Sequence, residues 1–189
     1  MEKKVLVETS ARHVHLSQEH IDALFGKGYQ LTNKKDLSQP GQFACEEKVE
    51  VIGPKGTLKM SILGPARSAS QVEVSATDAR VLGIKAPIRE SGDIAGSGAC
   101  TIKVGDQQVT LDEGVIIAKR HIHFTPEDAK AFGVQDKQIV KVRVEGERAL
   151  VFDEVVVRVS EKFAAAMHID TDESNAACVA PGTMGVILD

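Results

Sequence analysis

The sequence predicts a mainly β protein built from two similar halves with short helices. The first observation is a repeated motif: RHVHLS at 12–17 occurs again as RHIHFT at 120–125. Alternating apolar and polar segments, typical of strands, follow both copies. A helix start signal also follows each copy. Together these observations indicate an internal duplication.

The strand pattern is similar in the two halves. Apolar runs at 5–7 and 115–117 precede the two motif copies, which are themselves strand-like. The expected strands after them are 48–52 and 57–63 around a turn at 53–56, then 139–144, 149–152 and 155–159 around a turn at 145–148. Aromatic residues make up only 4% of the chain. The core must therefore consist of aliphatic side chains.

Two short helices have recognisable ends. Ser17 is the expected N-cap of a helix over 18–25 that ends at Gly26. Thr125 is the expected N-cap of the second, which has Pro126 at its first position and ends at Gly133. Each helix therefore begins directly after a copy of the repeated motif.

The repeat suggests a division into three segments. We expect a first half over 1–90, a crossover and strand over 91–110, and a second half over 111–189. Residues 86–110 have no evident counterpart, and 86–98 within them are rich in Gly and Ser. Their backbone N–H groups could hold an anion, although a plain linker explains the composition equally well.

Composition excludes several classes of function. The 189 residues carry a net charge of −4, so no global basic field would attract nucleic acid. No apolar stretch approaches the roughly 20 residues of a membrane span, and the first residues lack a signal peptide. The three cysteines are far apart, which favours a reducing cytosol. A homo-oligomer remains open.

The repeated His-x-His pairs indicate metal binding. On a strand, residues i and i+2 point to the same face, so His13 and His15 can converge on one ion. His121 and His123 can do the same. A wet, polar strand end would explain one such pair, but two copies in matching contexts favour metal.

A third ligand can be assigned in each half. Residues 71–79 can be aligned with 166–174, which places Glu73 opposite His168. Each half would then supply two histidines and one further ligand, the usual number for a catalytic zinc with an open position. Without that alignment, Glu73 would be an ordinary exposed strand carboxylate.

An arginine follows a sharp turn near the first expected site. Gly64 and Pro65 break the strand, and Arg67 comes six residues before Glu73. Its planar guanidinium suits bidentate binding of phosphate or carboxylate. The alternative is a surface arginine in an ion pair, which contributes little.

The motifs RHVHLS, GPAR at 64–67, QVEVS at 71–75 and RHIHF at 120–124 resemble those of phosphate propanoyltransferases, over most of the chain. The resemblance implies two β-barrel domains with a dinuclear zinc site between them. It implies conversion of acyl-CoA and phosphate to acyl phosphate and CoA. It also implies two zinc ions per chain, with Arg67 holding phosphate; the ligands would be His13, His15 and Glu73 for one ion and His121, His123 and His168 for the other.

A direct transfer follows as a hypothesis. One zinc would bind the CoA sulfur, because coordination deprotonates a thiol, while the second zinc and Arg67 would aim phosphate at the thioester carbonyl. No nucleophilic Ser or Cys is needed. Weaker candidates for substrate contacts are Ser91, Gly92, Lys34, Lys35 and Asn175.

At its N-terminus the chain differs from many members of the family that it resembles. Those members carry an extension that directs them into bacterial microcompartments, whereas only about four residues precede the first expected strand here. We therefore expect a cytosolic enzyme outside any shell, acting on acetyl as well as propanoyl groups.

Three rival readings remain. A dinuclear metallohydrolase often carries His-x-His-x-Asp-His, but Ser17 and Gln18 stand where the Asp and the second His would be. A cupin places its Glu a few residues after the pair, whereas Glu73 lies 58 residues (73 − 15) beyond His15. A non-catalytic metal-binding protein would leave Arg67 without a purpose. Phosphate-dependent formation of acyl phosphate separates all three.

Overall fold

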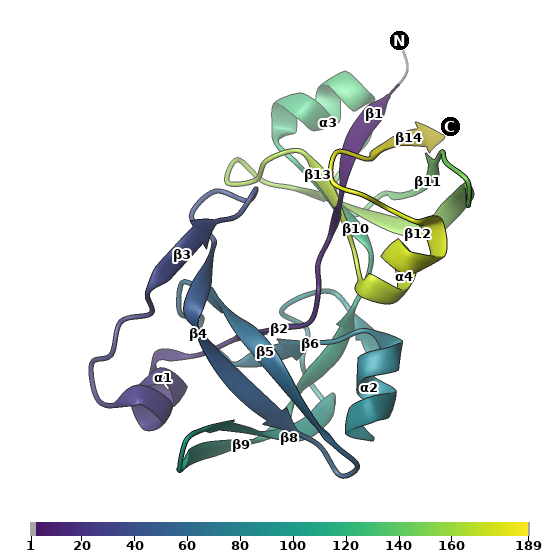
Figure 1. Ribbon diagram of the computed structural model, residues 1–189. Coiled ribbons are helices and arrows are strands. Elements are labelled where there is room, and N and C mark those ends of the chain that lie inside the picture. The colour runs from purple at the N-terminus through teal and green to yellow at the C-terminus, as the bar shows by residue number, and fades with distance from the viewer. Residues whose placement is uncertain (1–2, 189) are drawn as a thin grey trace. The chain divides into compact units, whose positions relative to one another are not determined.

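A computed structural model describes residues 3–188 and is mainly β (Figure 1). The described residues divide into two compact units. We call Ala11–Leu37 with Gly41–Ala118 the His13 unit, and 3–10 with Ser38–Pro40 and 119–188 the His121 unit. Each contains one of the repeated motifs.

The His13 unit contains a closed barrel of six strands. The order around the barrel is β4-β5-β2-β6-β9-β8, and β8 pairs with β4 to close it. Two shorter strands, β3 and β7, extend the sheet beyond the barrel. The elements are β2 (His13–His15), α1 (Gln18–Phe25), β3 (Asn33–Asp36), β4 (Phe43–Ile52), β5 (Thr57–Gly64), β6 (Gln71–Glu73), α2 (Ala76–Leu82), β7 (Ile88–Arg89), β8 (Gly98–Val104) and β9 (Gln107–Ala118).

The His121 unit contains a second closed barrel of six strands. Its order is β11-β12-β10-β13-β1-β14, and β14 pairs with β11 to close it. The elements are β1 (Lys4–Thr9), β10 (His121–Phe124), α3 (Pro126–Phe132), β11 (Ile139–Val144), β12 (Leu150–Val159), β13 (Ala166–Ile169), α4 (Thr171–Ala177) and β14 (Met184–Leu188). The prediction of two similar β-barrels with short helices is confirmed.

The two barrels have the same topology, including strand direction. The His-x-His strands β2 and β10 each pair in parallel with one neighbour and antiparallel with the other. The strands β6 and β13 then pair in parallel with β9 and β1. Figure 1 shows β1, in purple, running beside the yellow-green strands of the C-terminal half. The first strand of the chain thus completes the second barrel.

This arrangement differs from the expected boundaries at 90 and 111. Residues 3–10 belong to the His121 unit, and 91–118 belong to the His13 unit. The strands β8 and β9 also have counterparts, because β14 and β1 hold the same places in the other barrel. The apolar runs at 5–7 and 115–117 indicated β1 and part of β9, but they carried no information on which barrel each strand joins.

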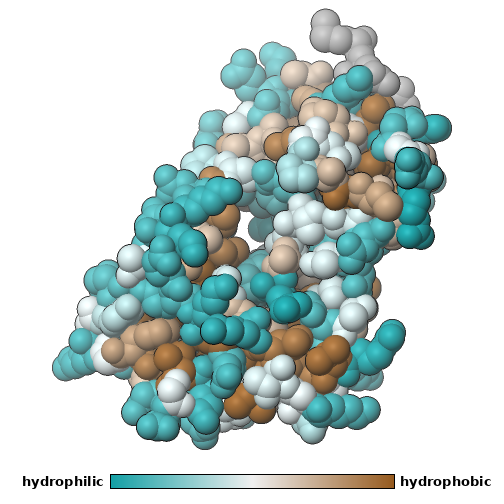
Figure 2. All heavy atoms as spheres, in the orientation of Figure 1, coloured by the Kyte–Doolittle hydropathy of each residue, from teal (hydrophilic) through white to brown (hydrophobic). Residues whose placement is uncertain are grey.

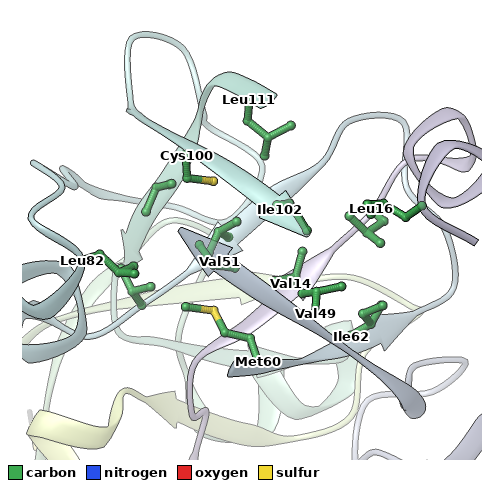
Figure 3. Close-up of a cluster of buried hydrophobic side chains, with 14 of the residues drawn as sticks. Val14, Leu16, Val49, Val51, Met60, Ile62, Leu82, Cys100, Ile102 and Leu111 are labelled. Carbon is green, nitrogen blue, oxygen red and sulfur yellow. The ribbon is translucent and has the colours of Figure 1, made fainter. Parts of the chain in front are cut away.

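Aliphatic side chains fill each barrel, as the low aromatic content requires. Figure 3 shows the cluster in the His13 unit, where Val14 and Leu16 from the His-x-His strand and its continuation meet Val51, Ile62 and Ile102. All five are fully buried. His13 and His15 alternate with these two core residues along the strand and so lie on its other face. Packing of Val14 in the core therefore orients the two histidines.

Each of the four described helices begins directly after a strand that carries a candidate ligand. The N-cap residues are Ser17, Ser75, Thr125 and Asp170, and the last three form capping boxes. The predicted helices at Gln18–Phe25 and Pro126–Phe132 are confirmed with their caps. The same motif of a strand, a helix cap and a short helix thus occurs twice in each barrel.

The surface is polar over most of the face in Figure 2, with scattered apolar areas. The large apolar residues exposed in the described part of the chain are Val81, Ile88, Ile139, Val151 and Met184. Across residues 3–188, no helix has the length and hydropathy that crossing a bilayer requires.

We predict that Thr125→Ala lowers the free energy of unfolding by about 1 kcal/mol. The Thr125 hydroxyl accepts the Asp128 backbone N–H (3.1 Å) and donates to the Asp128 carboxylate (2.7 Å). Chemical denaturation of the full chain measures the change. Thr125→Ser keeps the hydroxyl and is the matched control; equal losses in both variants would contradict the capping explanation.

Candidate functional site

The candidate ligands lie on two antiparallel strand pairs with the same register. In the His13 unit, His13 pairs with Glu73 across β2 and β6. In the His121 unit, His121 pairs with His168 across β10 and β13. Side chains opposite each other in such a pair have Cβ atoms about 5 Å apart. The sequence alignment of Glu73 with His168 therefore corresponds to the same place in the two barrels.

The first group is buried and closely spaced. The ligand atoms of His13, His15 and Glu73 all lie within 4.8 Å of one another. The two histidine Nε2 atoms are 3.1 Å apart, and Glu73 Oε2 lies 3.4 Å from His13 Nε2. The three side chains thus converge on one point.

Backbone carbonyls set the orientation of both rings in this group. His13 Nδ1 lies 2.8 Å from the Ala11 carbonyl oxygen, and His15 Nδ1 lies 3.2 Å from that of Leu63. Each carbonyl can only accept, so each Nδ1 carries the proton and each Nε2 of a neutral ring presents a lone pair. Two lone pairs and a carboxylate that face one another suit a bound cation, and metal-ligating histidines commonly donate their other N–H in this way.

The charges in the first group are strongly coupled. Burial lowers the pKa of His13, but the charge and hydrogen bond of Glu73 together with the hydrogen bond to Ala11 outweigh it, so the net pKa lies above its usual value. Burial raises the pKa of Glu73, but the charge of His13 and its hydrogen bond lower it by more, so the carboxylate stays ionised. Burial and the positive charges of His13 and Arg67 lower the pKa of His15 to about 3. His15 is therefore neutral at pH 7.

The second group repeats this arrangement with three histidines. The ligand atoms of His121, His123 and His168 lie within 4.8 Å of one another. His121 Nδ1 lies 2.9 Å from the Lys119 carbonyl oxygen, two residues earlier, as His13 Nδ1 does from Ala11. The ring of Phe163 packs against His123 with centroids 4.1 Å apart.

Two polar residues that the sequence reasoning missed surround His168. Oε2 of Glu8, a residue of β1, lies 3.7 Å from His168 Nδ1. Nε2 of Gln39 lies 3.4 Å from His168 Nε2. Gln39 is held in turn by both backbone groups of Ala164. No sequence signal identified these residues, because the pairing of β1 with β13 is what brings Glu8 to the site.

The predicted arginine lies beside the first group. The Arg67 backbone N–H donates to the Leu16 carbonyl oxygen (2.9 Å), which ties the turn to the end of the His-x-His segment. The Arg67 guanidinium donates to Ser91 Oγ (3.3 Å), and Ser91 Oγ donates to Glu73 Oε1 (2.8 Å). A cation and a hydroxyl thus stand next to the candidate metal ligands. This is an arrangement that can hold an anion.

The other substrate-contact candidates have different surroundings. Gly92 follows Ser91, and its N–H donates to Gln71 Oε1 (2.7 Å), so it lies at the same group. Lys34 and Lys35 are exposed on the edge strand β3, where Lys34 lies 3.7 Å from Glu46. Asn175 is exposed in α4. Their roles in binding CoA stay predictions.

Comparison with known proteins agrees with this geometry. Residues 6–180 match the family model described as phosphate propanoyltransferase. The chain is 60% identical over 183 residues to the phosphate propanoyltransferase of Enterococcus faecalis, covering 96% of this chain and 87% of that protein. It is 50% identical over 190 residues to the Thermotoga maritima protein of the same name, covering 100% and 90%. The chain belongs to the phosphate propanoyltransferase family of enzymes.

Proposed function

We propose that the enzyme converts acyl-CoA and phosphate to acyl phosphate and CoA, with propanoyl-CoA or acetyl-CoA as the acyl donor. Family membership supports the reaction. The observation that carries the site assignment is a pair of hydrogen bonds, from Arg67 to Ser91 and from Ser91 to Glu73. It combines an anion-binding group with a candidate metal group in one barrel.

Both histidine groups are assigned one metal ion each, and we propose zinc. The donor sets of two histidines with a carboxylate, and of three histidines, are those of catalytic zinc sites with an open position. Zinc bound there would polarise a substrate oxygen or stabilise a thiolate. The neutral His15 and the ionised Glu73 are in the protonation states that such binding requires, and a metal would displace a proton from His13, whose pKa is raised.

Phosphate is assigned to the group in the His13 unit. The Arg67 guanidinium would bind two phosphate oxygens and offset their charge, while Ser91 would hold Arg67 beside Glu73. The group in the His121 unit is assigned the thioester sulfur, since its three candidate ligands are all imidazoles and Arg67 lies at the other group. The assignment therefore follows the position of Arg67 beside the first group.

The transfer is proposed to be direct. A phosphate oxygen attacks the thioester carbonyl carbon, the C–S bond breaks, and CoA leaves as the thiolate. Burial raises the pKa of Cys45 to about 11 and that of Cys100 to about 12, so both thiols stay protonated and unreactive. Neither cysteine is suited to form an acyl-enzyme. Location in the cytosol, outside a shell, stays a prediction.

We predict two metal ions per chain, one in each barrel. Elemental analysis of gently purified protein should give about two zinc ions per chain, and His13→Ala and His121→Ala should each give about one. Chelation should abolish formation of acyl phosphate, and added zinc should restore it. Full activity in a metal-free preparation would refute the metal assignment.

Arg67→Lys should reduce kcat/KM for phosphate about 100-fold, because lysine keeps the charge but loses the bidentate fork. Steady-state rates of acyl phosphate formation at varied phosphate measure the change. Arg89→Lys, an arginine in an ion pair with Asp93 (3.8 Å), is the matched control and should keep normal kinetics. Unchanged phosphate kinetics in Arg67→Lys would remove Arg67 from the site.

A further inference from the structure

A buried glutamine next to the first ligand group has no role in the mechanism described above. Gln71 lies on β6, two residues before Glu73, and is only 2% exposed. Its Nε2 donates to Glu73 Oε1 (2.6 Å) and to Ser91 Oγ (2.9 Å). Its Oε1 accepts the Gly92 backbone N–H (2.7 Å). One side chain thus contacts the metal-ligand carboxylate and the loop beside Arg67.

These contacts allow only one orientation of the amide. The Gly92 backbone N–H, 2.7 Å from the amide, can only donate, so the amide atom facing it is the oxygen. The nitrogen of Gln71 must therefore face Glu73, and its oxygen must face Gly92. Ser91 then accepts from Gln71 and Arg67 and donates to Glu73. Every polar atom of the amide is satisfied, as a buried polar network requires.

The second barrel shows that the fold does not need a glutamine at this place. Gln71 pairs with His15 across β2 and β6, and Ala166 pairs with His123 across β10 and β13. Ala166 is also buried, at 1% exposed. The same backbone position therefore accepts a small apolar side chain. Burying an amide instead has a desolvation cost that its contacts must offset.

We propose that Gln71 is a positioning residue for the metal group and the phosphate loop of the His13 unit. It holds Glu73 Oε1, together with Ser91, so that Oε2 is the oxygen facing His13 (3.4 Å) and available to a metal. It also fixes Ser91 and Gly92 in place. The inference rests on the proposed metal binding at His13, His15 and Glu73.

Removing the amide would release two parts of the site together. Without Gln71, Glu73 Oε1 loses one of its hydrogen-bond donors. The carboxylate can then rotate, so that Oε2 no longer points at the metal. Changes to residues that orient metal ligands typically cost 10–100-fold in metal affinity. The loop would also lose the hydrogen bonds that Gln71 makes with Ser91 and Gly92, which weakens the support of Arg67. The His121 unit has no such contact and should be unaffected.

Variants that keep only one of the two histidine groups, called single-site proteins, test the role of Gln71 separately for each barrel. His121→Ala leaves the group of the His13 unit as the zinc site, and His13→Ala leaves the group of the His121 unit. Each is loaded with zinc and mixed with excess chromogenic chelator, and the rate of zinc transfer is recorded. Adding Gln71→Ala should speed transfer about 10-fold or more in the His121→Ala protein. It should leave the rate unchanged in the His13→Ala protein.

Gln71→Met is the matched variant, because it keeps most of the side-chain volume without polar atoms. It should release zinc as fast as Gln71→Ala. A normal rate in Gln71→Met would show that packing matters and not the hydrogen bonds, which overturns the inference. Unchanged release, or equal acceleration in both single-site proteins, would also overturn it while zinc binding stands. Failure of both single-site proteins to bind zinc would refute the proposed metal sites and this inference with them.

Discussion

The antiparallel pairing of a His-x-His strand with a shorter third-ligand strand is the constraint on which each candidate site depends. The register places His13 opposite Glu73 and His121 opposite His168. A shift of one residue would turn the ligands to the other face of the sheet. The core residue between the two histidines, Val14 or Ile122, is fully buried and resists such a shift. Packing in the barrel thus determines the geometry of the ligands.

The short helices support the same geometry. Each follows a ligand strand through a capped start, so the chain leaves the sheet immediately after the ligand and cannot extend the strand. The ligand strands β2 and β6 are accordingly only three residues long. Short strands between longer neighbours keep the candidate ligands at a strand end, while the alternate residues remain in the core.

The duplicated framework carries two different sets of surrounding residues. At the first group, Gln71 and Ser91 connect Glu73 to Arg67. At the second, the position of Gln71 is occupied by Ala166, and Glu8 lies beside His168 instead. The same topology therefore provides one group with a cation nearby and one with an additional carboxylate. The arginine beside the first group is the basis for proposing that phosphate binds there.

The sequence by itself determined the β-rich duplication, the two predicted helices with their caps and the alignment of Glu73 with His168. Those features depend on local periodicity, on cap chemistry and on the i, i+2 rule, all of which can be recognised within a few residues. Only the tertiary structure decided that β1 completes the second barrel, because an apolar run does not specify its pairing partner. It also decided that Gln71 and Ser91 meet at Glu73. Hydrogen bonds between residues about 20 positions apart depend on how the loop after α2 and β7 returns to the barrel, and no local pattern records that path.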